Sequence, residues 1–122
     1  MALTLRILGS CDVGVIGDFQ FYPGEDATFK AQLISLVTGC PVNIPSGATK
    51  TLRFIGTPTD VVIDDADITV SSDDASIFST VLDETQTEKI VSGSVTLEYT
   101  DGSVTKYAVL QNAVKRLNNP AI

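Results

Sequence analysis

The sequence contains no histidine and no tryptophan, and only two of its 122 residues are cysteines. Histidine is the commonest general base at neutral pH and the commonest metal ligand, so its absence removes the usual routes to acid–base and metal-assisted catalysis. A serine or threonine nucleophile would need a lysine, a carboxylate or the amino terminus as its activating base. The composition therefore predicts a protein that is not an enzyme and holds no cofactor.

Positive charge is also scarce. Eight Lys and Arg residues stand against fifteen Asp and Glu residues, which gives a formal net charge of -7. Proteins that bind nucleic acid neutralise its phosphates with basic side chains, so this balance excludes nucleic acid as a partner. The sequence therefore predicts that any macromolecular partner is of another kind.

Long hydrophobic runs are absent as well. No stretch of about 20 apolar residues is available to span a bilayer. The sequence Leu8-Gly9-Ser10-Cys11 looks like a lipoprotein processing site, but neither a basic start nor a long apolar segment precedes it. We therefore expect no signal peptide and no membrane partner.

The two cysteines, Cys11 and Cys40, are too few for the disulfide framework of a small secreted domain. Without histidine they also cannot complete the four nitrogen and sulfur ligands of a structural zinc site. We expect two free, partly buried thiols.

Hydrophobic and polar residues alternate along much of the chain, which is the pattern of half-buried strands. The segment 28–36 shows it clearly, and similar segments recur about every 8–12 residues, as in a β-sandwich. The sequence predicts one β-sandwich domain over residues 1–122, with an N-terminal strand at 2–8, a core from about 13 to 110 and a short tail over 111–122.

Two segments have a helical alternative. The polar stretch 83–91 is compatible with a short helical turn between strands. Leu110, Ala113, Val114 and Leu117 have the i, i+3, i+4, i+7 spacing of one helix face, so a short C-terminal helix is the alternative to an extended tail. Helices this short depend on docking, which favours the tail.

Asp101-Gly102 separates two alternating runs, 94–100 and 104–109. Asp-Gly is a strong signal for a two-residue hairpin turn, because both central residues need positive φ. With that turn, Tyr99 opposes Val104 and Val95 opposes Ala108.

Aspartates are concentrated between residues 60 and 74. Clustered carboxylates are the ligands that Ca²⁺ prefers, but the spacing here differs from that of an EF-hand loop. Aspartate is also common in turns, where it hydrogen-bonds to nearby backbone, and this second interpretation is favoured. The weak candidates for metal ligands are Asp64, Asp65, Asp67, Asp73 and Asp74.

Three groups of residues follow one another in a familiar order. The first is 22–26 (YPGED) before the strand 29–33, and the second is 38–44 (TGCPVNI) followed by 52–54 (LRF). The third begins at 78–82 (FSTVL) and ends at 97–102 (LEYTDG). In this order they resemble the immunoglobulin-like β-sandwich at the N-terminus of phage baseplate upper proteins, which also occurs in small tail- or fibre-associated proteins of tailed phages.

The resemblance implies an all-β, immunoglobulin-like antiparallel β-sandwich. It also implies a non-enzymatic virion structural protein, a tail, baseplate or fibre-associated adaptor that is made in the host cytoplasm. Its partners would be other phage structural proteins, and it would form a homo-oligomer. Asn43 departs from the pattern, which has aspartate there, and no receptor-binding head follows the sandwich, so we expect an adaptor rather than an adsorption protein.

The candidate contact residues flank the predicted core, and Tyr107 joins them if it lies on an outer face. They are Leu3, Leu5, Ile7, Tyr22, Leu110, Val114 and Leu117. The alternative function is a carbohydrate- or Ca²⁺-dependent adhesion module, whose end loops would bind the ligand.

Overall fold

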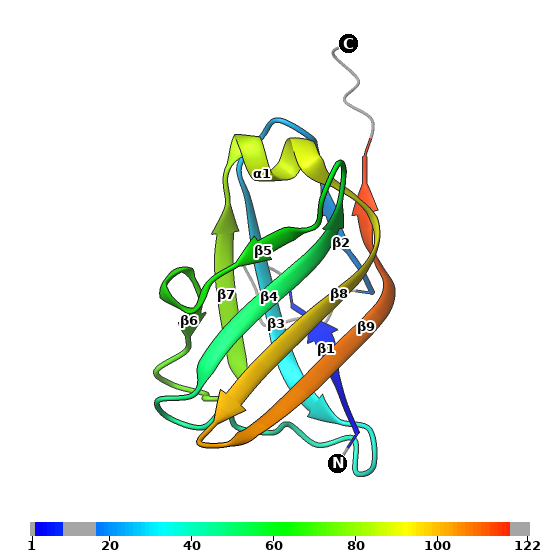
Figure 1. Cartoon of the computed structure of the whole chain (residues 1–122). Coiled ribbons are helices and arrows are strands. Elements are labelled where there is room, and N and C mark those ends of the chain that lie inside the picture. The colour runs from blue at the N-terminus through cyan, green and yellow to red at the C-terminus, as the bar shows by residue number, and fades with distance from the viewer. Residues whose placement is uncertain (1, 9–16, 118–122) are drawn as a thin grey trace.

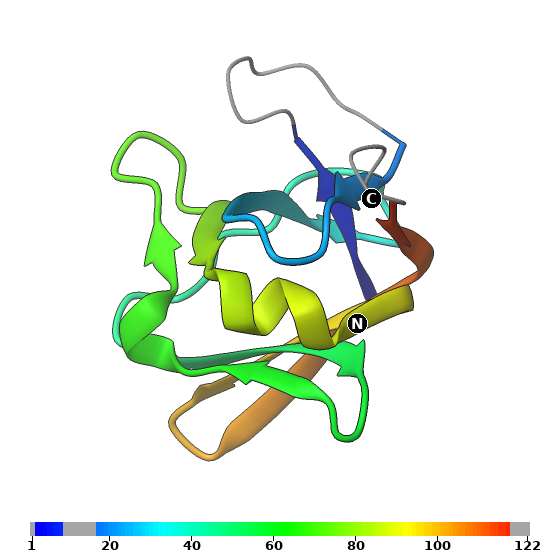
Figure 2. The ribbon, with the colours of Figure 1, turned by 90° about the horizontal axis from the view of Figure 1, so that it is seen from above.

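The computed structural model describes residues 2–8 and 17–117, which form two layers of strands and one short α-helix (Figure 1). In chain order the elements are β1 (Leu3–Ile7), β2 (Phe19–Phe21), β3 (Ala27–Ser35), β4 (Thr49–Gly56), β5 (Val61–Ile63), the 3-10 turn η1 (Asp65–Asp67), β6 (Thr69–Val70), β7 (Ile77–Leu82), α1 (Glu84–Lys89), β8 (Ile90–Asp101) and β9 (Val104–Arg116). The helix α1 lies over one end of the space between the layers (Figure 2). No helix among the described residues is long and apolar enough to cross a membrane.

The strands are hydrogen-bonded in the order β5-β4-β8-β9-β1-β3-β7-β6, and β2 pairs with β9. One layer therefore contains β1, β3, β7 and β6, and the other contains β5, β4, β8, β9 and β2. The chain changes layer after β1, β2, β3, β5 and β7, and crossings of this kind are typical of an immunoglobulin-like sandwich. The predicted all-β, immunoglobulin-like fold class is confirmed.

One side of the sandwich is joined and the other is open. β1 pairs antiparallel with β3 and also pairs in parallel with β9, where Leu3 lies beside Ala108. The hydrogen-bonded ladder therefore passes from one layer to the other at β1. On the opposite side β5 and β6 end the ladder, so the two layers separate there.

Aromatic side chains fill the core between the layers. Phe29 of β3 meets Phe54 of β4 edge to face, with ring centroids 5.1 Å apart and an interplanar angle of 89°. Phe19 of β2 meets Phe29 in the same way at 5.2 Å and 87°. This geometry brings the positive ring edge toward the negative face, so these contacts stabilise the packing of one layer on the other.

The helix α1 begins with a capping box. The Asp83 carboxylate accepts the Gln86 N–H at 2.8 Å, and the Gln86 side-chain oxygen accepts the Asp83 N–H at 2.9 Å. Thr87 is fully buried, and its hydroxyl accepts the Gly24 N–H and donates to the Glu25 carbonyl, each at 3.0 Å. These bonds dock α1 on the turn before β3, and the predicted helical turn in this region is confirmed.

The C-terminal segment is a strand as far as Arg116. The predicted tail over 111–122 is therefore wrong for residues 111–116, and the alternative helix is wrong as well. The reason is a pairing that local patterns do not reveal, because β2 lies parallel to residues 114–116. Residues 9–16 and 118–122, which include the predicted start of the core and Cys11, lie outside the described residues.

The helix-like spacing in β9 has another cause. Asn112 has a φ of 56°, a left-handed conformation that interrupts the alternation of a strand. Ala113 and Val114 are consequently both buried, although they are adjacent. The interruption coincides with a shift in the pairing of β8 with β9 between Gly93 and Val95.

The predicted β8–β9 hairpin is present, but its register is wrong by two residues. Asp101 pairs with Val104, so the turn residues are Gly102 and Ser103. Tyr99 therefore opposes Lys106, and Val95 opposes Leu110. Because the shift is an even number, the same side chains still point inward.

Candidate interaction surface

Four predicted contact residues lie inside the core of the chain itself. Leu3, Leu5, Ile7 and Val114 are only 6%, 2%, 2% and 1% exposed. β1 lies between β3 and β9, so the apolar face of this strand points into the sandwich. The prediction that these side chains contact another chain is therefore wrong, because they are already covered.

The other three predicted contact residues are more accessible. Tyr22 is 38% exposed, Leu110 is half-buried against the core, and Leu117 is half-buried and donates its N–H to the Phe21 carbonyl at 2.8 Å. Tyr22 and Leu117 directly follow the paired ends of β2 and β9, so they lie at one end of the domain. Their role in contacts stays a prediction.

Several of the aspartates between residues 60 and 74 bond to the protein itself. Asp65 Oδ1 lies 2.8 Å from Lys50 Nζ and also accepts the Lys50 N–H, and these bonds hold the pKa of Asp65 below its ordinary value. Asp74 accepts the N–H and the hydroxyl of Ser76, which lowers its pKa in the same way. Within residues 2–8 and 17–117, no three acidic or cysteine side chains come together in a group that could hold a metal ion.

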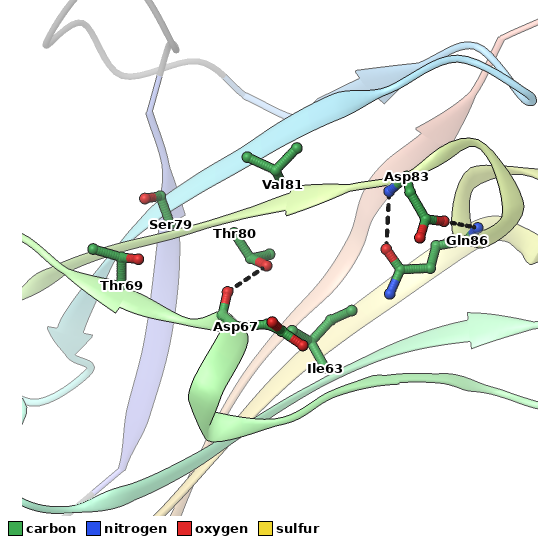
Figure 3. Close-up of a pocket in the computed structure, with 8 residues that line it drawn as sticks. All are labelled: Ile63, Asp67, Thr69, Ser79, Thr80, Val81, Asp83 and Gln86. Carbon is green, nitrogen blue, oxygen red and sulfur yellow. Dashed lines mark hydrogen bonds between the residues drawn. The ribbon is translucent and has the colours of Figure 1, made fainter.

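A polar cavity of about 300 Å³ lies at the open side of the sandwich, between β5 and the β6–β7 pair (Figure 3). Its polar walls are used by the fold. Thr80 Oγ1 donates to the Asp67 carbonyl at 2.8 Å, and Asp83 and Gln86 form the capping box of α1. Ile63 of β5 closes the apolar side. The cavity is therefore a gap between two sheet edges, and Thr80, Asp83 and Gln86 of its lining also hold the fold together.

The end of the domain opposite α1 presents an apolar turn. Leu36 and Val37 are 62% and 76% exposed at the start of the β3–β4 connection. The Ser35 hydroxyl accepts the N–H groups of Val37 and Thr38, which fixes the turn. Cys40, in the same connection, is exposed and not in a disulfide, so the expected partial burial of this thiol is wrong.

A second exposed apolar surface is the outward side of the layer formed by β5, β4, β8 and β9, which we call the outer face. Four side chains dominate it: Ile55, Val62, Tyr107 and Val109, which are 43%, 41%, 58% and 41% exposed. The inward residues of the same strands are buried, including Leu52, Phe54, Val95 and Leu97. The outer face therefore breaks the rule that the solvent side of an alternating strand is polar.

The pairing of the strands arranges these side chains in rows. Val62, Arg53, Thr96 and Val109 lie side by side across the four strands. The next row contains Thr51, Glu98 and Tyr107. Ile55 lies beyond Arg53 on β4, next to Gly93, where any added Cβ would come within 2.8 Å of the Ile55 side chain. Gly93 thus leaves the space that Ile55 occupies.

The outer face carries one cation and one anion, Arg53 and Glu98, although the whole chain has a net charge of -7. The Arg53 guanidinium lies 3.6 Å from an Asp60 carboxylate at the rim, with both side chains partly exposed. An exposed ion pair of this kind is weak, so Arg53 keeps donors free for another partner. The outer face thus combines four exposed apolar side chains with threonines, one cation and one anion, and Asp60 lies at its rim.

Sequence reasoning found only Tyr107 of this face. The sequence does contain a sign of the other apolar residues, because some strands have β-branched residues on both of their sides. In the segment 61–63, for example, Val62 points outward between two buried residues. A strand with apolar residues on both sides is covered on both sides or has an exposed apolar face.

No protein-family model matches the chain, and no curated protein sequence matches it. Among solved structures, the Ig-like domain of human leucine-rich repeat-containing protein 4 is 12% identical, over 97% of this chain and 88% of that chain, with a TM-score of 0.44. A mutant titin M10–obscurin-like 1 Ig complex gives 10% identity over 98% and 97% of the two chains and a TM-score of 0.43. The titin domains Z1Z2 in complex with telethonin give 13% identity over 98% and 49%, with a TM-score of 0.42.

These values are too low to say anything about the function of this chain. The immunoglobulin-like assignment is carried by the strand order and the two-layer arrangement described above. The titin structures are complexes with another protein, and that statement concerns titin alone.

Proposed function

We propose that this domain is not an enzyme and acts through protein–protein contacts made by its outer face. The observation that carries the proposal is the set of four exposed apolar side chains, Ile55, Val62, Tyr107 and Val109, on one face of a strongly acidic protein. Exposed apolar side chains gathered on one face, with polar residues between and around them, are a feature of interaction sites in soluble domains, and aromatic residues are enriched in such sites.

We further propose that the domain is a structural part of a tailed-phage virion, an adaptor in the tail, baseplate or fibre. This part of the proposal is supported by the resemblance of residues 19–110, approximately, to the sandwich of phage baseplate upper proteins. Its partners are other structural proteins of the particle. Self-association through the same face is compatible with the symmetric assemblies of such particles.

The test compares particles assembled with two variants of the chain. Tyr107→Asp places a charge on the outer face, and Val81→Asp places the same charge at a 66% exposed position on β7 in the other layer. We expect mass spectrometry to find the wild type and Val81→Asp in purified particles, and Tyr107→Asp to be lost from them. Absence of the wild-type protein from particles would refute the virion role, and equal incorporation of both variants would refute the role of the outer face.

A further inference from the structure

Four residues of the outer face, two charged and two large and apolar, are placed so that they complement the same four residues of a second copy. Thr96 lies at its centre, with Arg53 beside it on the neighbouring strand β4 and Glu98 two residues along β8. Tyr107 lies one strand from Glu98 on β9, and Ile55 lies two residues from Arg53 on β4. A diagonal line through Thr96 and Thr51 therefore has Arg53 on one side and Glu98 on the other. Ile55 and Tyr107 lie farther out, also on opposite sides of this line.

We infer that the partner of the outer face is a second copy of this chain, related by a two-fold axis that lies in the interface and passes over Thr96 and close to Thr51. This inference rests on the proposed function, because it names the occupant of the same face. A two-fold contact brings one patch against the identical patch, so the patch must be complementary to itself.

The first consequence of this axis is a pair of ion pairs. Rotation by 180° about this axis places the spacing between two neighbouring strands of one copy over the spacing between residues i and i+2 of the other copy. Strands are about 4.8 Å apart and two residues span about 6.7 Å, so the two spacings differ by only about 2 Å. Arg53 then faces the partner's Glu98, and Glu98 faces the partner's Arg53.

The second consequence is apolar contact around these charges. Tyr107 faces the partner's Ile55, and Ile55 faces the partner's Tyr107. The threonines at the axis, Thr96 and Thr51, are small and half-buried, so the two sheets approach closely there. The strands of the two copies cross at roughly 90°, which is the orthogonal mode of sheet packing.

Charge favours this face over the acidic edge of the domain. The open side of the sandwich carries Asp64, Asp65, Asp67, Asp83 and Glu84 along η1 and the start of α1. Two copies that met at that edge would bring like charges together, which disfavours association. On the outer face Arg53 and Glu98 carry opposite charges, with Asp60 beside Arg53 at the rim, so two copies repel each other far less there than at the acidic edge.

The area of the outer face limits the affinity of the proposed dimer. Four strands and three to four rows cover roughly 20 Å by 25 Å, or about 500 Å² for each copy. The total of about 1,000 Å² is at the lower end for specific interfaces, so the dimer is weak and exchanges with monomer. Neighbouring copies that are held in one particle would associate far more completely, because tethering raises their effective concentration.

Charge reversal tests the inference with sedimentation velocity over a wide range of protein concentration. The wild type should shift from 12.9 kDa toward twice that mass as its concentration rises. Arg53→Glu and Glu98→Arg should each weaken self-association by at least about tenfold, because attraction becomes repulsion at two symmetric contacts. The double variant, and an equimolar mixture of the two single variants, should associate again, because both restore opposite charges at every contact.

Lys30→Glu is the matched control, since it makes the same change of charge on β3 in the other layer and should leave association unchanged. Glu98→Arg leaves both residues of the Arg53–Asp60 ion pair unchanged. Its effect on self-association therefore cannot come from loss of that ion pair. Circular dichroism melts confirm that each variant is folded.

A wild type that stays monomeric at every concentration would overturn the inference, as would equal weakening by Arg53→Glu and Lys30→Glu. Failure of the mixed variants to associate would also overturn it, because only a self-complementary contact predicts that rescue. The proposed function has a separate test. If the chain is monomeric but Tyr107→Asp is still lost from particles, then the outer face binds a different protein and only the second copy is refuted.

Discussion

Thr87 is a polar side chain at a fully buried position, and its hydroxyl both accepts and donates hydrogen bonds to the backbone of the turn at Gly24 and Glu25. A buried polar group that loses its partner costs far more than the bond contributes when it is made. Residues of this kind determine where α1 sits, because the helix is too short to be stable by itself.

Thr87→Val keeps the shape of this side chain and removes its hydroxyl. The Gly24 N–H and the Glu25 carbonyl then lose a buried partner, so the free energy of unfolding should fall by about 1–3 kcal/mol. Urea unfolding followed by circular dichroism measures it. Thr85→Val in the same helix is exposed and should change stability by less than about 0.5 kcal/mol; an equal loss in both variants would refute the role of the buried hydroxyl.

Asp65 makes stability depend on acid pH. Its bonds to Lys50 lower its pKa in the folded protein from the ordinary 3.8, so its contribution is fully present above that pH and is lost as the pH falls through the lowered pKa. Asp65→Asn should therefore lower Tm at pH 7, and the difference from wild type should shrink as the pH falls below about 4. Asp64→Asn is the control, because the Asp64 side chain makes no cap bond to η1; a difference in Tm that did not change with pH would contradict this account.

At the scale of the element, β9 shows how one residue changes which side chains of a strand point inward. Asn112 adopts a φ of 56°, which lets the following residues turn Val114 into the core and pair with β2. Asparagine tolerates this conformation better than most residues, and a β-branched residue tolerates it poorly.

Asn112→Val should lower the free energy of unfolding by about 1–2 kcal/mol, whereas Asn112→Gly should be close to neutral. Gln111→Val is the matched control, because it places the same side chain at the neighbouring exposed position without positive φ. Chemical denaturation of the three variants measures the difference. If valine were tolerated equally well at 111 and 112, the left-handed conformation would not be what shapes the end of β9.

At the scale of the whole molecule, one cluster of buried residues runs through both layers, and Cys40 is exposed and not in a disulfide. The stability of the fold therefore comes from packing. We expect a single cooperative unfolding transition for the monomer, and the same Tm with and without a thiol reductant, measured by calorimetry at low protein concentration. A fall in Tm on reduction would contradict this account.

Local patterns predicted the elements well and the long-range pairings poorly. The alternation of β3 and β4, the polar turn at α1 and the Asp-Gly hairpin are all encoded within a few residues. The pairing of Phe19 with Val114 joins parts of the chain that lie far apart in sequence, and no local period reports it. The extended end of β9 was missed for that reason.

The outer face was missed for a related reason. Leu3, Leu5 and Ile7 form an apolar face that suits an interface as well as a core, and only the insertion of β1 between β3 and β9 decides that it is core. Conversely, Ile55, Val62 and Val109 are apolar residues on the opposite side of their strands from the buried residues, and no further layer covers that side. The alternation of residue types along a strand shows which side chains share a side. The packing of the layers then decides which side is covered.

The parallel course of β1 and β9 also has a mechanical consequence. β1 starts at the end of the domain opposite α1, and β9 finishes near α1 (Figure 1). Tension applied through the two ends would pull these parallel neighbours past each other in opposite directions. The hydrogen bonds that β1 makes with β3 and β9, and those between β2 and β9, would then bear the force together in shear instead of opening one at a time. A domain linked in this way transmits pulling force along its length with little extension.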